Sequence, residues 1–471
     1  MTVRNAWSGR TFPHPPGRVP VAGDTFTLRR GAPLSNVMRH SAGRGALFEL
    51  QVFSQKFVFV TDALLAAELC DETRFRKALS PALVELREFV GDALFTAFVG
   101  EPNWDIAHHV LMPAFTKPAM RGYHDTMLET VAEMFAVWDA GDGPVDVTAD
   151  MTRLTLETIS RTAFSRDFGS FSSREPHPFV TAMISALTTG MQKSSLSAIP
   201  GTGRVRQRID ERNAAHRAYV DDLVDELVRD RRASGQERGD LLDLLLSGRH
   251  EGRALDDLNI RQQILTFLVA GHETTSGALS FALFYASRDP EVMAKARAET
   301  DALLGPDPDA EPTFEQVPKF RYIRRILDEA LRLWPTAPGF ARSPLETTTI
   351  GAGTDHEAVM TPDDWALVLL PTTQRDPQVW GPDAERFDPD RFLPENSKGR
   401  PAHTYKPFGT GERACIGRQF ALHEAVLVLA RLFHRYEFAG DPDAELKIHE
   451  RLTIVPRDFH LAFSRRTPAR V

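Results

Sequence analysis

One of the chain's two cysteines, Cys415, lies in a stretch whose residue types suit metal ligation, KPFGTGERACIG (406–417). A thiolate is a soft metal ligand, and it must be deprotonated to bind. The glycines of this stretch let the backbone turn tightly and approach a flat ligand without a Cβ in the way. The apolar helix pattern that follows, RQFALHEAVLVLARLF, offers the free N–H groups and positive dipole of a helix N-terminus. With Arg413 two residues away, the stretch predicts an ionised cysteine beside a planar group.

Three other interpretations of these residues are weaker. GTGERA matches the dinucleotide pattern G-x-G-x-x-A, but that pattern needs a preceding strand, and PAHTYKPF makes a poor one. Zinc would need further Cys or His at ligand spacing, and HETTS (272–276) lacks the second histidine of H-E-x-x-H. Composition alone also allows the interpretation that Cys415 is a buried structural cysteine. Cys70, within LLAAELCDE, is expected to be such an inert core thiol.

Composition narrows the class of protein. The chain has 471 residues, of which 42% are hydrophobic and 25% charged, as in ordinary globular proteins. A net charge of -8 without a long basic run argues against a nucleic-acid partner. Two cysteines form no disulfide framework, the N-terminus has no apolar signal core, and no stretch approaches the roughly 20 apolar residues of a membrane span. We expect a soluble, cytoplasmic, monomeric protein.

The elements that must position the cysteine stretch are mostly helices. YVDDLVDELV (219–228) places its valines and leucines on one helical face, and QKSSLSAIPGTGRV, between Met191 and Arg206, predicts a break between two helices. ALFELQVFSQKFVFVTD (46–62) predicts a β-hairpin, and TTTIGAG, WALVLLP and RLTIVP predict short strands.

No boundary is strong enough to split the chain, so residues 1–471 are expected to form one domain. Its β-rich parts are expected at roughly 20–63, 340–375 and 440–465, and its helical parts at roughly 64–335 and 416–437.

FGTGERACIG (408–417) resembles the haem-binding loop of the cytochrome P-450 superfamily, Phe-x-x-Gly-x-Arg-x-Cys-x-Gly. Phe408, Gly411, Arg413, Cys415 and Gly417 fill its fixed positions. The resemblance covers nearly the whole chain and is closest to bacterial fatty-acid hydroxylases whose haem domain is fused to a flavin reductase. Three further segments resemble that subgroup: LTFLVAGHETTSGALSFAL, DEALRLWPTAPGF and CIGRQFALHEAVLVLA.

The resemblance implies the cytochrome P-450 fold: mainly α, a large helical domain with small peripheral sheets, and haem b between a long central helix and the cysteine loop. Cys415 would be the axial ligand of the haem iron, and its thiolate would favour O–O cleavage. Phe408 and Gly417 would lie against the cofactor. The resemblance also makes Lys77, Trp104, His108 and Arg413 partners of the haem propionates; a buried aromatic and a core histidine are the plain alternative for Trp104 and His108.

A long helix pattern, NIRQQILTFLVAGHETTSGALSFALFYA (259–286), would face the other side of the haem. Thr274 follows Ala270 by four residues, so its hydroxyl can donate to that carbonyl, and with Gly271 close by a local bulge is expected. Glu273 and Thr274 resemble the family's acid–alcohol pair, which relays protons to bound oxygen. A solvated glutamate and a threonine satisfied within its own helix are the alternative.

DEALRLWP places Glu329 and Arg332 three residues apart on one helix face, which by itself usually means a surface ion pair. Here the pair resembles the family's E-x-x-R, and ERFDPDRF supplies Arg391 as the third partner. The resemblance implies a buried structural triad rather than a catalytic group.

By resemblance the pocket on the substrate side is apolar, which suits a lipophilic guest, and Phe95 would orient that guest above the haem. Its lining would comprise Leu83, Leu86, Phe89, Val90, Phe95, Val269, Ala270, Ala337, Gly339 and Leu452. In the fatty-acid subgroup an Arg and a Tyr at the channel mouth hold the carboxylate, but Gln55 and Phe59 stand at the matching positions. Lys56 is adjacent but faces the other way by strand alternation. A neutral secondary-metabolite intermediate is therefore at least as good a candidate as a fatty acid.

The sequence thus predicts a haem-thiolate monooxygenase that uses O₂. Because the chain ends after RLTIVPRDFHLAFSRRTPARV, electrons from NAD(P)H are expected to arrive through a ferredoxin or flavodoxin type partner, unless a reductase segment lies beyond it. Such a partner would dock on a positive face made by Lys117, Arg121, Lys406, Arg413 and Arg418. Nitration, coupling or rearrangement chemistry, a peroxygenase and a haem sensor remain as alternatives.

Overall fold

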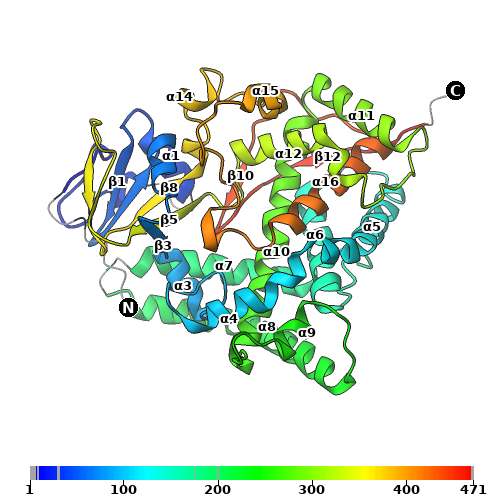
Figure 1. Ribbon diagram of the computed structural model, residues 1–471, viewed down its shortest axis with the longest axis horizontal. Helices are drawn as coiled ribbons and strands as arrows, with labels where there is room; N and C mark the ends of the chain where they lie inside the picture. The colour runs from blue at the N-terminus through cyan, green and yellow to red at the C-terminus, as the bar shows by residue number, and fades with distance from the viewer. Residues whose placement is uncertain are drawn as a thin grey trace.

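A long helix, α10 (Asp257–Ala286), runs through the middle of the molecule (Figure 1). The structure, a computed structural model, describes residue 7 and residues 10–28, 32–173, 175–197, 199 and 201–467. The Asp256 side chain caps α10 by accepting a hydrogen bond from the Asn259 N–H. The helix is buried on nearly all sides because its sequence is apolar nearly all round.

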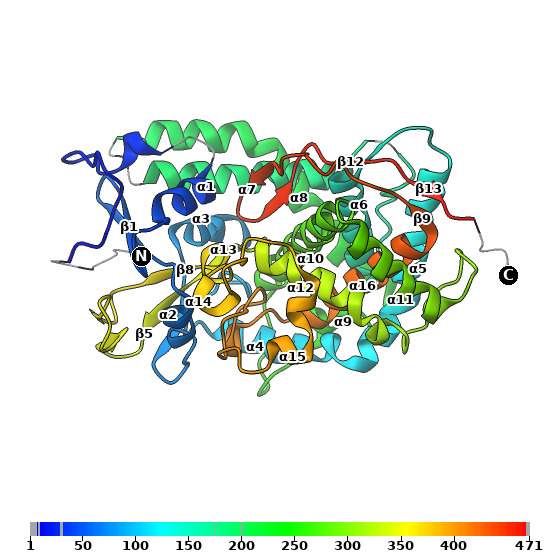
Figure 2. The ribbon, with the colours of Figure 1, turned by 90° about the horizontal axis from the view of Figure 1, so that it is seen from above.

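The other helices surround α10. They are α1 (Pro33–Ser41), α2 (Ala63–Glu68), α3 (Pro81–Val90), α4 (Pro102–Leu111), α5 (Lys117–Asp139), α6 (Val147–Phe164), α7 (Pro178–Ser197), α8 (Gly203–Ser234), α9 (Leu241–Ser247), α11 (Pro290–Leu304), α12 (Arg321–Leu333), α13 (Leu370–Thr373), α14 (Pro377–Trp380), α15 (Pro394–Ser397) and α16 (Arg418–Arg435). Short 3₁₀ turns lie at Thr25–Thr27, Met112–Phe115, Val317–Lys319, Pro389–Phe392 and Gly411–Arg413. α6, α12 and α16 pack directly on α10. Seen from above, α7 and α8 run side by side, and α7 packs on α3 (Figure 2).

The strands form one larger sheet and several small ones. They are β1 (Leu47–Val52), β2 (Gln55–Val60), β3 (Phe75–Ala78), β4 (Val145–Asp146), β5 (Gly339–Pro344), β6 (Thr348–Ile350), β7 (Ala358–Met360), β8 (Ala366–Leu369), β9 (Tyr436–Glu437), β10 (Ile448–Glu450), β11 (Ile454–Pro456), β12 (His460–Leu461) and β13 (Ser464–Arg465). The larger sheet has the order β1-β2-β8-β5-β3, in which only β2 and β8 pair in parallel. Figure 1 shows it at the side of the molecule where the N-terminal segments lie.

Most elements lie where the sequence predicts them. The hairpin over 46–62 is present as β1 and β2, with Leu47 opposite Val60. On α8, Val220, Leu223, Val224 and Leu227 are buried on one face, as the helical pattern indicates. The predicted break between Met191 and Arg206 is shorter than expected, since α7 continues to Ser197.

Four of the expected ranges need correction, since 340–375 also holds α13 and 416–437 also holds β9. The part expected to be β-rich at 20–63 also holds α1, whose sequence, PLSNVMRHS, begins with a proline at its first turn. The helical part at 64–335 also holds β3 and β4, which are held by pairing with β5 and β12, far away in sequence. In the part of the chain that the structure describes, none of the helices combines the length and apolarity needed to cross a bilayer.

Candidate active site

The loop that carries Cys415 is held by its own backbone. The Cys415 N–H donates to the Phe408 carbonyl at 2.9 Å. Gly409 and Gly411 adopt φ values of 72° and 67°, in the region that favours glycine. A Cβ at Gly411 would also collide with the Glu72 carboxylate. The loop ends at the start of α16, so Cys415 precedes a helix N-terminus as predicted.

The Cys415 side chain opens onto an internal cavity. Burial raises the pKa of its thiol, and this outweighs the lowering by the Gly417 N–H and the Arg418 charge. Desolvation is thus stronger than the effect of the helix terminus, so the permanently ionised cysteine that the sequence predicts would depend on a metal ion. A bound metal ion would supply the charge that makes it a thiolate.

The cavity has a volume of about 360 Å³ and collects most of the residues that the sequence singled out. Its lining includes Lys77, Leu83, Leu86, Val90, Phe95, Trp104, His108, Val269, Ala270, Glu273, Thr274, Ala337, Gly339, Phe408, Arg413, Cys415 and Leu452. Gly417 lies beside the lining, where a Cβ would be 4.0 Å from the Cys415 Sγ. Residues from four distant segments, namely α3, α10, the start of β5 and the β10–β11 turn, thus meet the cysteine loop in one cavity.

Phe89 is the predicted pocket residue that falls outside the described lining. Leu83, Leu86 and Val90 share one face of α3, at spacings of three and four residues. Phe89 is rotated by about 100° from Val90 and packs against the core instead.

The prediction also missed pocket residues. Leu94, Leu187, Phe267, Phe340 and Thr453 line the cavity as well. Thr453 follows the predicted Leu452 and could have been found from it. Leu187 comes from α7, and only the packing of α7 over α3 brings it to this place.

Three cations line the cavity, and two of them, Lys77 and Arg413, are not ion-paired with a carboxylate in the described part of the chain. The third, Arg342, lies 3.8 Å from the Glu72 carboxylate. The Lys77 Nζ donates to the Phe95 carbonyl at 2.6 Å, and the Arg413 Nη2 donates to the Ala97 carbonyl at 2.5 Å. Burial and the Arg413 charge lower the pKa of Lys77 to about 7, and burial lowers the pKa of Arg413 to about 10. The Nε of Arg413 is buried with no hydrogen-bond partner in the described residues.

Buried cations without counter-charges are costly, so this arrangement fits a ligand that brings anionic groups. The Arg413 guanidinium lies over the Trp104 ring at 4.4 Å, and that ring stacks on His108 at 4.8 Å between centroids. Burial lowers the pKa of His108, so its imidazole is neutral near pH 7. A haem with its two carboxylates requires a soft sulfur ligand, flat apolar walls and two unpaired cations, and the cavity offers all of them.

α10 opens to the cavity for one turn. Between Gln263 and Phe284 the residues that are not buried are Ala270, Gly271 and Thr274. The Thr274 hydroxyl donates to the Ala270 carbonyl at 2.8 Å, which confirms the hydrogen bond that the spacing predicts. α10 continues as an α-helix through these residues, so the expected bulge does not interrupt it.

Glu273 differs from its neighbour in orientation. Its carboxylate is 6% exposed, and its Oε1 accepts a hydrogen bond from the Arg451 Nη1 at 2.8 Å. The Oε2 is buried with no hydrogen-bond partner in the described residues. Arg451 begins the turn between β10 and β11, so a residue far along the chain holds the acid of the expected acid–alcohol pair.

Gly277, one turn after Glu273, lets the β10–β11 hairpin lie close to α10. A Cβ at Gly277 would lie 2.8 Å from the Thr336 Cγ2 and 3.0 Å from the Ile454 carbonyl oxygen. The Ile454 N–H in turn donates to the Thr336 carbonyl at 2.9 Å. α10, the segment before β5 and β11 are therefore packed at backbone contact.

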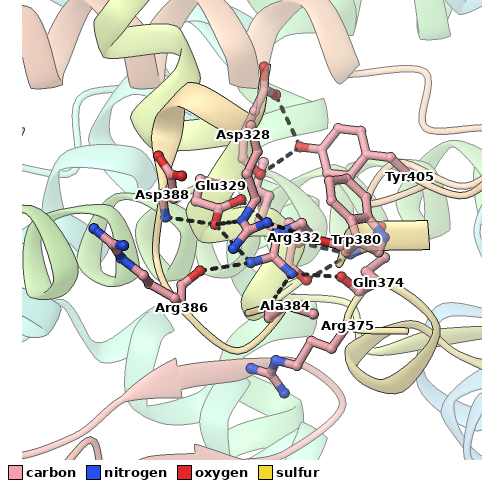
Figure 3. Close-up of polar contacts among 12 residues, drawn as sticks. Asp328, Glu329, Arg332, Gln374, Arg375, Trp380, Ala384, Arg386, Asp388 and Tyr405 are labelled. Atoms are coloured by element: carbon pink, nitrogen blue, oxygen red, sulfur yellow. Dashed lines mark hydrogen bonds and ion pairs between the residues drawn. The ribbon is translucent and has the colours of Figure 1, made fainter. Parts of the chain in front are cut away.

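Behind the cavity, Glu329 and Arg332 form a buried ion pair (Figure 3). The Arg332 Nε and Nη2 donate to the two Glu329 carboxylate oxygens at 2.6 and 2.7 Å. The Arg391 Nε lies 3.5 Å from the same carboxylate, so the three predicted partners are together.

Main-chain groups complete this network (Figure 3). Arg332 donates to the carbonyls of Gln374, Ala384 and Arg386, and Glu329 accepts from the Asp388 N–H. The opposite side of α12 presents Leu327 and Leu331 to the cavity. The network therefore fixes the helix that forms part of the cavity wall.

The expected channel mouth carries no ionic clamp at the matching positions. Gln55 is half-buried at the start of β2, and Phe59 is buried. Lys56 points to the other face of the hairpin, where its Nζ lies 3.0 Å from the Glu49 Oε2, as the strand alternation predicts.

Two cations near the end of α7 are also paired with acids, whereas Arg204 is exposed with no ion pair among the described residues. Lys193 bonds Glu88 and Asp210, and Arg206 bonds Glu85 at 2.7 Å. α7 and α8 are thereby tied to α3, which carries part of the cavity lining.

A second buried acid, Glu424 on α16, lies apart from these groups. Burial raises the pKa of its carboxyl to about 8, although the nearby Thr158 hydroxyl acts in the opposite direction. Thr158 is not in hydrogen-bonding geometry, and neither Glu424 oxygen has a partner in the described residues. Burial therefore favours the neutral form of the Glu424 carboxyl.

The face expected to attract a redox partner is smaller than predicted. Lys117, Arg121 and Arg418 are exposed and Lys406 is half-buried, but Arg413 turns into the cavity. Arg121 is already paired with Glu315 at 2.5 Å.

Comparison with known proteins agrees with this geometry. Residues 13–463 match the family model described as Cytochrome P-450. The bifunctional cytochrome P-450/NADPH–P-450 reductase 1 of Bacillus subtilis is 40% identical over 449 residues, covering 94% of this chain and 41% of that protein. The bifunctional protein of the same description from Bacillus cereus is 41% identical over 445 residues, covering 93% and 41%. A self-sufficient cytochrome P-450 monooxygenase of Phanerodontia chrysosporium is 37% identical over 461 residues, covering 96% and 42%. The chain thus spans about two fifths of the length of these relatives.

Proposed function

Because the chain belongs to the cytochrome P-450 family, a haem-thiolate family, we propose that it is a monooxygenase that inserts one oxygen atom from O₂ into a lipophilic small molecule. The observation that carries the proposal is the position of Cys415, which opens into the same cavity as the accessible Ala270–Thr274 turn of α10. Activation of O₂ needs a metal-ligating sulfur and a small niche beside a hydroxyl and an acid.

The proposed holders of the haem are the residues that meet in the cavity. Cys415 would ligate the iron, and Lys77 and Arg413 would pair with its two carboxylates, with Trp104 and His108 beside them. When bound, the haem supplies activation of O₂ and transfer of one oxygen atom to the guest.

The chain's own residues would deliver protons and exclude water from the site. Glu273 would take protons from the solvent side and pass them toward the Thr274 hydroxyl, which the Ala270 carbonyl holds in place. Apolar residues from α3, β5 and the β10–β11 turn would exclude water and orient the guest. The buried acid beside the threonine favours a monooxygenase over a peroxygenase, which needs no such proton relay.

The proposed substrate is neutral or weakly polar rather than a long-chain fatty acid anion. Gln55 and Phe59 cannot form an ionic clamp, and Lys56, Lys193 and Arg206 are engaged with acidic side chains. A carboxylate that bound Lys56, Lys193 or Arg206 would have to compete with the acid that already pairs with it.

Electrons are proposed to come from NADPH through a reductase. The names of the Bacillus relatives include an NADPH–P-450 reductase in the same polypeptide, and an equivalent activity, fused or separate, would serve this chain. A ferredoxin or flavodoxin type donor is the second possibility. In either case the donor would approach the exposed basic residues Lys117 and Arg418.

The test is turnover of the haem-loaded protein with a surrogate reductase, NADPH and a panel of neutral and anionic lipophiles under ¹⁸O₂. The proposal expects one ¹⁸O atom in the product of at least one neutral lipophile. NADPH consumption without a product from any member of the panel, or oxygen derived from water, would contradict it.

A further inference from the structure

The turn between β10 and β11, Arg451–Leu452–Thr453, touches two parts of the site at once. Leu452 and Thr453 line the cavity, and the Arg451 N–H donates to the Thr453 carbonyl at 2.9 Å, which holds the turn tight. The missing side chain of Gly277 lets this hairpin lie directly on α10. The turn is therefore fixed relative to both the guest and the buried acid of α10.

The Arg451 side chain bridges solvent and that acid. It is 20% exposed, whereas the Glu273 carboxylate to which it donates is 6% exposed. Burying a carboxylate to this extent is costly unless a cation or several hydrogen-bond donors face it. His272, the neighbour of Glu273 on α10, cannot be that cation, because burial lowers the pKa of its imidazole and keeps it neutral.

Thr274 and Glu273 leave α10 in different directions. Consecutive side chains on a helix diverge by about 100°, and the Thr274 hydroxyl bonds the Ala270 carbonyl while the Glu273 carboxylate bonds the hairpin. One carboxylate oxygen is therefore occupied at the hairpin, and the other, Oε2, is buried without a partner in the described residues.

We propose that Arg451 is a positioning residue for proton delivery, which fixes the Glu273 carboxylate with one oxygen at the solvent-facing hairpin and leaves the other for the cavity. A proton from water beside Arg451 binds the carboxylate, a proton leaves on the Thr274 side, and the carboxylate is restored. The inference rests on the proposed monooxygenase function, since it assigns the route of the protons that this function consumes.

Other charged residues of the hairpin are directed elsewhere. The Glu450 carboxylate accepts from the Leu34 N–H at 2.7 Å, and Arg457, at the far end of β11, is half-exposed beside Asp458. Arg457 therefore provides a matched control: an arginine in the same hairpin, with no described contact to Glu273.

The experiment compares haem-loaded wild type with Arg451→Gln, Arg451→Lys and Arg457→Gln, using NADPH, a surrogate reductase and a neutral lipophile that the wild type oxidises. Product and peroxide per NADPH are measured in H₂O and D₂O. Arg451→Gln should lower product per NADPH by about tenfold, raise peroxide and enlarge the solvent isotope effect. Arg451→Lys, which keeps the charge, should restore most of the coupling, and Arg457→Gln should stay within about twofold of wild type.

Two further variants separate positioning from general damage. If Arg451 acts through the acid, Glu273→Gln and the double variant Arg451→Gln/Glu273→Gln should lose coupling to the same degree as Arg451→Gln. Independently of turnover, the thermal midpoint should fall in each single variant, and the double variant should fall by less than the sum of the two.

Coupling and a solvent isotope effect equal to wild type in Arg451→Gln, or strictly additive thermal shifts, would overturn the role of Arg451 while leaving the proposed function intact. A wild type that makes no oxygenated product would instead refute the proposed function and, with it, this inference.

Discussion

Gly277 on α10 and Ile454 on β11 are in backbone contact, so close that a Cβ at Gly277 would lie 3.0 Å from the Ile454 carbonyl oxygen. That contact sets the distance between the long helix and the hairpin that bears Arg451 and Leu452. The position of the cavity wall and that of the Glu273 partner thus depend on one missing methyl group.

Gly277→Ala should destabilise the protein by about 1–3 kcal/mol, because the added methyl meets backbone and β-branched neighbours that cannot yield. The thermal midpoint of the haem-loaded protein measures this. Gly190→Ala on α7, where a Cβ would meet nothing within 4 Å, should be neutral or slightly stabilising. Equal midpoints for the two variants would mean that the contact is loose.

Cys415→Ser should abolish the shifted absorbance band that thiolate-ligated ferrous haem shows with CO, because an alcohol is not a thiolate. Cys70→Ser is the matched control, since Cys70 is buried and does not line the cavity. Its spectrum should be that of the wild type. Retention of the band in Cys415→Ser would assign the iron ligand elsewhere.

Thr274→Ala should keep haem and guest binding but divert electrons from product to peroxide, because the hydroxyl held by the Ala270 carbonyl is lost. We expect product per NADPH to fall by about tenfold or more, as for loss of a proton-transfer group. Thr274→Ser, which keeps the hydroxyl, should couple close to wild type. Unchanged coupling in the alanine variant would remove Thr274 from proton delivery.

Glu424 should make the stability of the protein fall as pH rises. Burial raises the pKa of Glu424 from 4.5 to about 8 in the folded state, so the folded chain holds a proton that the unfolded chain releases. Its contribution is fully present below pH 4.5 and is lost as pH rises toward 8, by an amount on the order of 4 kcal/mol.

Glu424→Gln stays neutral at every pH and should lack this loss. The difference in unfolding free energy between Glu424→Gln and wild type should therefore grow in favour of the variant from pH 5 to pH 8. A difference that is constant with pH would show that Glu424 does not titrate on unfolding.

Long-chain fatty acids should bind weakly, and Gln55→Arg with Phe59→Tyr should tighten their binding by up to roughly 1–3 kcal/mol through a charge-assisted bond. Spectral titration with palmitate and with a neutral ester of the same length measures this. The ester should bind both proteins alike. Tight palmitate binding to the wild type, unaffected by the double substitution, would place the carboxylate elsewhere.

Local spacing accounts for what the sequence could predict. The Cys415 loop, the Ala270–Thr274 hydrogen bond and the Glu329–Arg332 pair each depend on residues within a few positions of one another. Such contacts follow from helix and loop geometry alone.

Contacts between distant segments account for what the sequence missed. The Arg451–Glu273 ion pair joins residues 178 positions apart, and β3 is a strand only because β5 lies beside it. Phe89 was misplaced because a shift of one residue on α3 turns a side chain by about 100°, from the cavity to the core. The pKa of Cys415 depends on how deeply the packed protein buries it, which spacing does not reveal.

The two unpaired cations of the cavity make cofactor loading a proton-linked equilibrium. Burial and the charge of Arg413 bring the pKa of Lys77 to about 7. An anionic group placed beside it would return Lys77 to its charged form, and the proton that Lys77 takes up would offset the proton that Cys415 releases when a metal ion makes it a thiolate. Above pH 7 the two proton changes oppose each other, so the affinity for the cofactor would vary less with pH than either group alone would make it vary.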